Sequence, residues 1–239
     1  MRRTDLSTGR ADRLRIGPWR GDPGIALLSP VPGAVPSSLG LARAVVEVAA
    51  RGYRSILTPA LARAEQEVFL EQGFIVHERL HLLGHDLRSR PEPRVEGVRL
   101  RRAHRTDIGA VLIVDGLAFD GFWRFDRAGL DDARRATPRA RFTVAEFDDR
   151  IVGYHVTGMA GRLGYLQRLA VHPQTQGRGI GTALIGDSLD WCARRHGTSM
   201  LVNTQETNLG ALHLYRRLGF VDEPTGLAVL SLDLAAIAP

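Results

Sequence analysis

The sequence predicts an α/β protein whose mixed, mostly antiparallel sheet carries helices on both faces, with a smaller, truncated α/β unit ahead of it. Two observations predict this class. Segments with strand and helix periodicity alternate over 97–235, with hairpin signals in the middle, and a shorter alternation runs over 25–90. Between them, the stretch 88–94 has two prolines among charged residues. We therefore expect a flexible arm over 1–24, units over 25–90 and 97–239, and a linker over 91–96.

The smaller unit follows from apolar periodicity and from the residues that interrupt it. Three prolines after its first apolar run exclude a continuing strand, because proline cannot donate to a ladder. Gly52 and Gly73 follow helical segments and are typical of helix C-termini. The expected elements are a strand at 25–28, a helix at 39–51, a strand at 55–58, a helix at 60–72, and two antiparallel strands at 74–77 and 80–87.

The larger unit has clearer signals. Thr106 and Asp107 can cap a helix, and Asp148-Asp149-Arg150 separates two strand-like segments as a hairpin turn does. The expected elements are a strand at 98–102, a helix at 106–118, an aromatic loop at 119–125, a helix at 126–136, hairpin strands at 142–147 and 151–157, a strand at 163–171, a helix at 179–196, a strand at 200–203, a helix at 208–218, and closing strands at 219–222 and 227–235.

The two units share a sequence pattern. In each, a helix, a glycine, a strand and a second helix lead to a Gly-Phe pair, at 73–74 and at 219–220. The spacing from Gly52 to the first pair and from Gly197 to the second differs by one residue. A repeat of this kind indicates a duplication whose first copy is truncated.

The composition is that of a globular protein, with 44% hydrophobic and 24% charged residues. No apolar run approaches the ~18 residues that span a bilayer. The formal charge is +6 and all 32 basic residues are arginine, so the chain has no lysine for a Schiff base or a Walker-type phosphate site. The arginines are spread evenly and alternate with acidic residues, which favours the arginine usage of a GC-rich genome over binding of nucleic acid or an anionic ligand.

Cysteine usage and the first residues bear on location and on metals. A single cysteine, Cys192, cannot form an internal disulfide, which is typical of the reducing cytoplasm. The absence of clustered His and Cys spacings predicts that there is no metal site. The first residues are charged and no apolar segment follows them, which argues against a signal peptide.

A glycine-rich turn between an apolar strand and a long helix carries the main chemical signal. The segment Gln176-Gly177-Arg178-Gly179-Ile180-Gly181 has the pattern Q-x-x-G-x-G. Glycines let a backbone approach a ligand closely, and the first N–H groups of a helix are free to bind anions. Together with the helix dipole they predict a cradle for a pyrophosphate, with Arg178 at its rim. The dinucleotide fingerprint lacks its third glycine, at Thr182, and a plain helix start remains an alternative.

The glycine turn and its flanking segments resemble the GCN5-related N-acetyltransferases (GNAT). The flanking segments are Leu169-Ala170-Val171-His172-Pro173 before the turn, and Asn208 and 211–220 after it. The likeness covers about 97–235, and the smaller unit is similar to the C-terminal half of a further, degenerate GNAT unit. The resemblance implies a GNAT-type sheet in a tandem arrangement. It also implies direct transfer of an acetyl group from acetyl-CoA, the co-substrate, to a primary amine, without a metal.

Residue roles are carried over from the family by position. The family places the pyrophosphate of acetyl-CoA on the glycine turn and pairs the pantetheine arm with a strand that splays from its neighbour. The resemblance implies cofactor binding by Leu169, Ala170, Val171, Gln176, Gly177, Arg178, Gly179, Ile180, Gly181, Thr182, Asn208 and Ala211. Tyr215 occupies the position of the general acid, since a tyrosine with a pKa near ~10 can protonate the departing thiolate. Packing for Tyr215 and helix capping for Asn208 remain alternatives.

The general base is not identified by the sequence. The chain is more weakly similar to the branch that contains the ribosomal-protein alanine acetyltransferases, where a glutamate stands at the position of Asn203. An asparagine cannot act as a base, and Tyr165 and Gln167 are equally non-basic. His155 and Glu206 are candidates, although core packing and solvation explain them as well, so a water relay is the default expectation.

The acceptor is expected at the aromatic loop over 119–125. Its Phe and Trp side chains, with Asp120 and Asp126, could receive a small cationic amine or a peptide N-terminus, although packing explains the loop too. The smaller unit has no catalytic counterpart, because Phe69 stands where the repeat has Tyr215. Two other functions remain open: a non-catalytic acetyl-CoA-binding or regulatory module, and a nucleic-acid-binding protein, which rests on charge alone.

Overall fold

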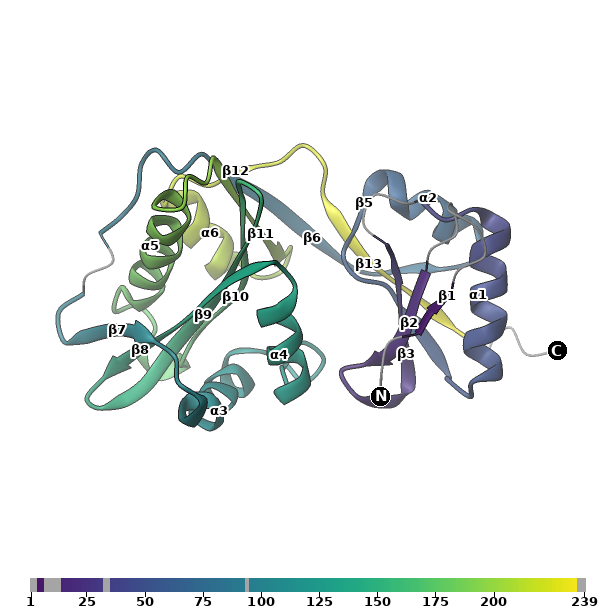
Figure 1. Cartoon of the computed structure of the whole chain (residues 1–239), viewed down its shortest axis with the longest axis horizontal. Coiled ribbons are helices and arrows are strands. Elements are labelled where there is room, and N and C mark those ends of the chain that lie inside the picture. Colours follow the sequence, from purple (N-terminus) through teal and green to yellow (C-terminus); the bar gives the residue numbers. More distant parts are fainter. Residues whose placement is uncertain (1–3, 7–13, 32–34, 93–94, 236–239) are drawn as a thin grey trace. The chain divides into compact units, whose positions relative to one another are not determined.

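The computed structural model describes residues 4–6, 14–31, 35–92 and 95–235 (Figure 1). It divides the chain into two compact units. Unit 1 comprises Met1–His81, Gln205–Thr207 and Pro224–Pro239, and unit 2 comprises Leu82–Thr204 and Asn208–Glu223. Each unit therefore takes residues from both halves of the sequence.

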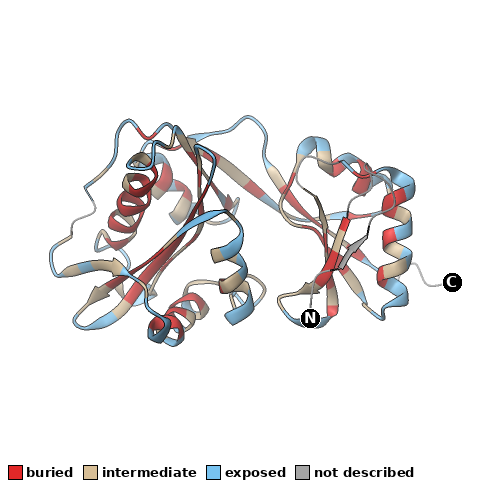
Figure 2. Cartoon of the chain, viewed as in Figure 1, coloured by how far each residue is buried: buried red, intermediate tan, exposed pale blue. Residues whose placement is uncertain are grey.

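Unit 1 is a mixed sheet with two helices. Its described elements are β1 (Thr4–Leu6), β2 (Leu14–Trp19), β3 (Asp22–Pro30), α1 (Ser38–Ala50), β4 (Ser55–Leu57), β5 (Leu61–Ala62), α2 (Arg63–Glu71), the first part of β6 (Ile75–His85) and β13 (Leu227–Asp233). The strand order is β1-β2-β3-β4-β13-β6, with β5 beside β13. Only β3 and β4, among these described pairs, run parallel. Leu41 of α1 and Phe69 of α2, both fully buried, pack with the strands in one apolar core (Figure 2).

The predicted flexible arm over 1–24 is wrong for the described residues, because β2 and β3 form a hairpin there. Arg20 and Gly21, in its two-residue turn, have φ of 48° and 80°, the left-handed values that this turn requires. Leu14 and Ile16 point inward and are each 1% exposed. The sequence analysis missed this hairpin because an alternation of only two apolar residues is a weak strand signal beside nearby prolines and glycines. The remainder of the predicted arm, 1–3 and 7–13, lies outside the described residues.

The two strands predicted at 74–77 and 80–87 form one strand, β6, so that prediction is wrong. No turn residue separates them, and Glu78 and Arg79 continue the ladder opposite Val229 and Ala228. With 11 residues, β6 is long enough to contribute Ile75 to His81 to unit 1 and its last four residues to unit 2.

The strand predicted to close the larger unit lies elsewhere. This strand, β13, pairs with β4 on one side and β6 on the other, within unit 1. Val229 and Leu230 are consecutive and both buried, so β13 is apolar on both faces and suits a central position in a sheet. The predicted boundaries at 90 and 97 therefore differ from the structural division, in which unit 2 begins at Leu82.

Unit 2 is built on the mixed, mostly antiparallel sheet that the sequence predicts. Its described elements are the end of β6, β7 (Val98–Arg102), η1 (Arg105–Asp107), α3 (Ile108–Ala118), α4 (Arg127–Arg135), β8 (Arg139–Phe147), β9 (Arg150–Ala160), β10 (Leu163–Val171), η2 (Pro173–Thr175), α5 (Ile180–Ala193), most of β11 (Ser199–Gln205), α6 (Leu209–Arg217) and β12 (Val221–Asp222). The strand order is β7-β8-β9-β10-β11-β6, and β12 pairs with β6.

Helices cover both faces of the unit 2 sheet (Figure 1). Val144 of β8 packs in the cluster that contains α3 and α4 side chains, whereas its neighbour Ala145 packs in the cluster that contains α5 side chains. Successive strand residues point to opposite faces, so α3 and α4 lie on one face and α5 on the other. Cys192 is fully buried on α5, as expected of a packing residue, and burial raises the pKa of its thiol to about 12.

The structure confirms the internal repeat. β3 and β4 pair in parallel over 25–27, and β10 and β11 pair in parallel over 163–165. In each unit the helix after this pair ends at a glycine in the left-handed region, Gly73 or Gly219. Unit 1 thus repeats, in shortened form, the strand and helix order of unit 2.

Candidate functional site

The two parallel strands of unit 2 separate toward their carboxyl ends. β10 and β11 pair only at 163–165 and 199–201, in a part of the chain that the structure describes without a gap. Beyond this point β10 has a bulge at Gln167, where the register against β9 shifts between Leu166 and Arg168. The separation leaves one edge of β10 open after the bulge.

The open edge of β10 presents backbone polar groups. His172 donates its N–H to the carbonyl of Val152 at 2.7 Å, so the two residues form a hydrogen-bonded pair. Because such pairs alternate along an antiparallel ladder, Leu169 and Val171 direct their N–H and C=O groups away from β9, toward the open edge. The side-chain amide of Gln176 donates to the Val171 carbonyl at 3.2 Å. The N–H groups of Leu169 and Val171 remain available to a ligand.

The glycine turn places free amides at the start of α5. The first helical hydrogen bond runs from the Ala183 N–H to the Gly179 carbonyl, and the described residues offer no acceptor to the amides of 177–182. Gly177 and Gly179 both have φ of 78°, which favours glycine. A Cβ atom on Gly181 would lie 3.0 Å from Leu214 Cδ2. A Cβ atom on Gly179 would lie 3.2 Å from Val95 Cγ2, so the turn has room for glycine but not for a larger residue. These backbone positions fit a pyrophosphate, because the amides can donate to it.

A pocket of about 380 Å³ joins the glycine turn to the open edge of β10. Its lining contains every predicted cofactor-binding residue except Arg178: Leu169, Ala170, Val171, Gln176, Gly177, Gly179, Ile180, Gly181, Thr182, Asn208 and Ala211. The Arg178 guanidinium lies instead 5.3 Å from the centre of the Phe147 ring. Sequence reasoning missed Arg217, which also lines the pocket. Gly210, Leu214 and Arg217 are spaced so that all three lie on one face of α6. This spacing is the sequence signal that could have indicated Arg217 as a lining residue.

The two predicted residues on or before α6 differ in their placement. Asn208 lines the pocket and also caps α6, because its side-chain oxygen accepts from the Ala211 N–H at 3.2 Å. Tyr215 is 5% exposed, packs against Phe220 and does not belong to the pocket lining. Its hydroxyl has no hydrogen-bond partner among the described residues. Burial raises its pKa, so the hydroxyl keeps its proton at neutral pH.

His155, a candidate base in the sequence, is a core residue outside the described pocket lining. It is fully buried on β9, where Nε2 lies 2.9 Å from an Asp187 oxygen and Nδ1 lies 2.8 Å from the Thr157 hydroxyl. Arg141 donates two hydrogen bonds to the same carboxylate, each 2.7 Å long. These partners satisfy the imidazole within the core, and the pocket lining does not include it.

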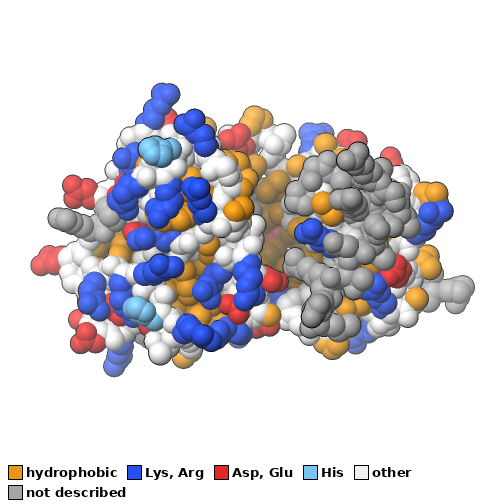
Figure 3. All heavy atoms as spheres, viewed as in Figure 1, with side chains coloured by type: hydrophobic (Ala, Val, Ile, Leu, Met, Phe, Trp, Pro, Cys, Tyr) orange, Lys and Arg blue, Asp and Glu red, His pale blue; other side chains and the backbone are white. Residues whose placement is uncertain are grey.

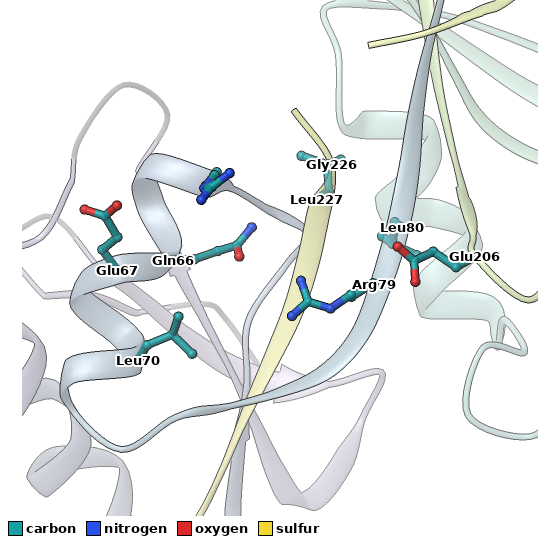
Figure 4. Close-up of a pocket in the computed structure, with 9 residues that line it drawn as sticks. Gln66, Glu67, Leu70, Arg79, Leu80, Glu206, Gly226 and Leu227 are labelled. Atoms are coloured by element: carbon teal, nitrogen blue, oxygen red, sulfur yellow. The ribbon is translucent and has the colours of Figure 1, made fainter. Parts of the chain in front are cut away.

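The other candidate base, Glu206, and the three polar residues that the sequence analysis set aside as non-basic also lie apart from the pocket lining. Tyr165 and Gln167 are half-buried on β10, and Asn203 is exposed on β11. Glu206 lines a second cavity, of about 480 Å³, within unit 1 (Figure 4). Figure 4 shows Gln66 of α2 and Arg79 of β6 extending into this cavity from opposite sides. The described residues therefore supply no carboxylate or imidazole to the lining of the unit 2 pocket.

The aromatic loop contributes one side chain to the pocket. Phe119 is part of the lining. Asp120 accepts from the Trp123 N–H at 3.0 Å, and Asp126 caps α4 by accepting from the Gly129 N–H at 2.7 Å. Both carboxylates thus serve the local backbone, although the sequence suggested that they receive an amine.

Arginine side chains are numerous on the face of unit 2 in Figure 3. Ion pairs neutralise part of this charge, as between Arg141 and Asp187 or Arg134 and Asp131. None of the described helices is long and apolar enough to cross a membrane. The described residues also contain no group of three or more His, Cys, Asp or Glu side chains that could hold a metal ion.

A mixed sheet whose parallel strands part beside a glycine-rich helix start defines an α/β protein suited to a phosphate-containing cofactor. Residues 113–220 match the model of the acetyltransferase (GNAT) family. The mycothiol acetyltransferase of Amycolatopsis mediterranei is 30% identical over 205 residues, which are 77% of this chain and 67% of that protein. The chain therefore belongs to the GNAT family, which confirms the resemblance found in the sequence.

Other relatives agree with this assignment. The mycothiol acetyltransferase of Streptomyces coelicolor is 35% identical over 62% of this chain and 50% of that protein, so the chain spans about half the length of such curated relatives. A tandem GNAT protein from the clavulanic acid biosynthesis pathway has a TM-score of 0.67, at 17% identity, over 92% of this chain and 78% of that one. A GCN5-related N-acetyltransferase from Kribbella flavida has a TM-score of 0.65, at 16% identity, over 96% and 89%. The two structures share the fold of this chain.

The buried His155 predicts a pH-dependent stability. Burial lowers the pKa of His155 below 6.5, although Asp187 favours the charged imidazole. Below pH 6.5 the unfolded chain therefore binds a proton that the folded chain excludes, and stability falls by up to about 1.4 kcal/mol per pH unit. We expect His155→Gln to lower stability at pH 7.5 but to flatten its decline toward pH 5.5, as measured by urea unfolding. The exposed His213→Gln variant is the control, and an unchanged decline in His155→Gln would contradict the prediction.

Proposed function

We propose that this chain is an acetyl-CoA-dependent N-acetyltransferase whose catalytic unit is unit 2. The observation that carries the proposal is the continuous pocket from the free amides at the start of α5 to the open edge of β10. The amides suit the pyrophosphate of coenzyme A, and the N–H groups of Leu169 and Val171 suit its pantetheine arm. Acetyl-CoA bound there would supply an activated acetyl group.

The residues of unit 2 support direct transfer to a neutral amine. The attack builds negative charge on the thioester oxygen, and an N–H on the open edge of β10 can stabilise that charge. The departing thiolate needs a proton, and we assign its donation to the Tyr215 hydroxyl, which is protonated at neutral pH. Because the described pocket lining holds no carboxylate or imidazole, a water relay would carry away the proton of the incoming ammonium group.

The acceptor that we propose is the primary amine of a small molecule. The mycothiol acetyltransferases among the relatives support this class over a protein N-terminus, which is the alternative acceptor. Neither Asp120 nor Asp126 belongs to the described pocket lining, and each accepts a hydrogen bond from the local backbone. Selection of the acceptor therefore rests on shape and backbone groups more than on a carboxylate.

A second candidate function is an acetyl-CoA-binding regulatory module without turnover. Two observations favour it: Tyr215 lies outside the pocket lining, and no base candidate belongs to that lining. The two functions share the cofactor and differ only in acetyl transfer. A panel of small amines and peptides, assayed for release of the coenzyme A thiol, therefore separates them.

Acetyl-CoA is expected to raise the melting temperature. A ligand that binds only the folded state at a hundred times its Kd stabilises a protein by about 2.7 kcal/mol. We expect coenzyme A alone to give most of this shift, because the pyrophosphate makes the main contacts, and adenosine to give little. Differential scanning fluorimetry at saturating ligand measures it. No shift with acetyl-CoA or coenzyme A would count against both candidate functions.

A further inference from the structure

A buried ion pair in unit 2 lies directly behind the pocket wall and has no role in the chemistry proposed above. Asp115 of α3 is fully buried and Arg168 of β10 is 9% exposed. The Arg168 Nε and Nη2 atoms donate to the two Asp115 oxygens at 2.7 and 2.8 Å. The same carboxylate also accepts from the Tyr154 hydroxyl and from the Phe125 N–H. Four donors thus hold Asp115, and the pair has a single geometry.

The guanidinium of Arg168 also holds the aromatic loop. Its Nη2 atom donates to the Trp123 carbonyl at 2.8 Å. The Cζ atom of Arg168 lies 3.3 Å from the centre of the Phe119 ring and 3.9 Å from the centre of the Phe125 ring. A planar group with fixed hydrogen bonds and two aromatic contacts restricts how far either ring can move.

Phe119 connects this cluster to the pocket. Its ring contacts Arg168 and also lines the pocket, together with Leu169 and Ala170. Along β10, Val171 lies beside the glycine turn, because its carbonyl accepts from Gln176, and Leu169 lies further from the turn. Phe119 contacts Arg168, the residue before Leu169, so it lies toward the end of the pocket away from the turn. The phosphates belong at the turn, so the acyl group of a thioester would lie toward Phe119.

We propose that Arg168 is a positioning residue that, by fixing the Phe119 ring, limits the length of the acyl chain that the pocket admits. The inference rests on the proposed function, since it concerns the same pocket. On this proposal a two-carbon acyl group would leave the ring in place, whereas a four-carbon group would need the ring to move against its contact with Arg168. The geometry therefore makes the pocket selective for acetyl over longer acyl groups.

The test compares the affinities of acetyl-CoA and butyryl-CoA by isothermal titration calorimetry. We expect the unmodified chain to bind butyryl-CoA at least about tenfold more weakly than acetyl-CoA, which is a difference of about 1.4 kcal/mol. Phe119→Ala removes the ring and keeps the ion pair, and Arg168→Lys keeps the charge but loses the planar fork. Both variants should bring the affinities for acetyl-CoA and butyryl-CoA to within about threefold of each other.

Arg141→Lys is the matched control, because Arg141 forms the same two-bond contact with the buried Asp187 and does not line the pocket. It should lose stability yet keep the acetyl preference. Equal affinities in the unmodified chain overturn the proposal. If Phe119→Ala loses the preference for acetyl-CoA and Arg168→Lys keeps it, the role of Arg168 is overturned. If Arg168→Lys does not fold, the preference of Phe119→Ala still decides whether the ring limits the acyl chain. Absence of binding by every thioester and by coenzyme A contradicts instead the proposed function.

Discussion

Gly179→Asp is expected to abolish binding of acetyl-CoA. Gly179 has φ of 78° at the start of α5, where the described residues offer no acceptor to the amides of 177–182. A Cβ atom on Gly179 would also lie 3.2 Å from Val95 Cγ2. An aspartate there sets a negative charge against the pyrophosphate and competes for the amides that would bind it. We expect Kd for coenzyme A to rise by about 100-fold or more, equivalent to about 2.7 kcal/mol, as measured by isothermal titration calorimetry.

Two further variants separate charge from backbone strain. Gly179→Asn brings nearly the same volume and conformational strain without the charge, so it should bind coenzyme A more weakly than the unmodified chain but better than Gly179→Asp. Gly161→Asp is the control for strain, because Gly161 has φ of 59° in the β9–β10 turn and a Cβ atom there has nothing within 4 Å. It should keep full affinity. Equal affinities of Gly179→Asp and the unmodified chain would reject the glycine turn as the phosphate cradle.

Tyr215→Phe is expected to lower turnover about 100-fold and leave the affinity for acetyl-CoA unchanged, because a general acid contributes about 10²–10⁴-fold to a rate. The hydroxyl has no hydrogen-bond partner among the described residues, so its removal leaves no buried group unpaired. The internal repeat supports the expectation that a phenylalanine packs well at this position. Phe69, the matching residue of unit 1, contacts Phe74 with ring centres 5.1 Å apart, as Tyr215 contacts Phe220 at 5.5 Å.

The readout for Tyr215→Phe is kcat with the best acceptor of the amine panel, alongside calorimetric Kd and the melting temperature. Tyr53→Phe, at a partly buried tyrosine of the unit 1 core, is the control and should retain the activity of the unmodified chain. A full rate in Tyr215→Phe would show that the thiolate leaves without this acid. A lost rate together with a lowered melting temperature would point to packing as the role of Tyr215.

Local signals predicted most of the elements, and the predicted cofactor-binding residues other than Arg178 line one pocket. The strand Val98–Arg102 was predicted with its observed bounds, and the glycine turn, the preceding strand and Asn208 come together around one pocket. These features depend on short-range chemistry: apolar periodicity, capping side chains and glycine conformations. The residues of the turn are close in sequence, so their proximity in space needed no knowledge of the rest of the fold.

Long-range pairing could not be predicted in the same way. No short-range sequence signal indicates that β13 pairs with strands of unit 1 and not with β12. A strand that is apolar on both faces fits a central position in either sheet. The bulge at Gln167 likewise depends on the register against β9. Partners far apart in sequence were equally hidden, as for His155, whose burial beside Asp187 removed it from the candidate bases.

The amino-acid sequence by itself determined the family, the internal repeat and the glycine turn, because each is written in residues a few positions apart. Only the tertiary structure decided which strands complete each unit and which side chains face the pocket. It also decided that Arg168 and Asp115, 53 positions apart, hold the aromatic loop. The physical reason is that burial and ion pairing depend on distances in space, which the folded chain sets and local periodicity does not encode.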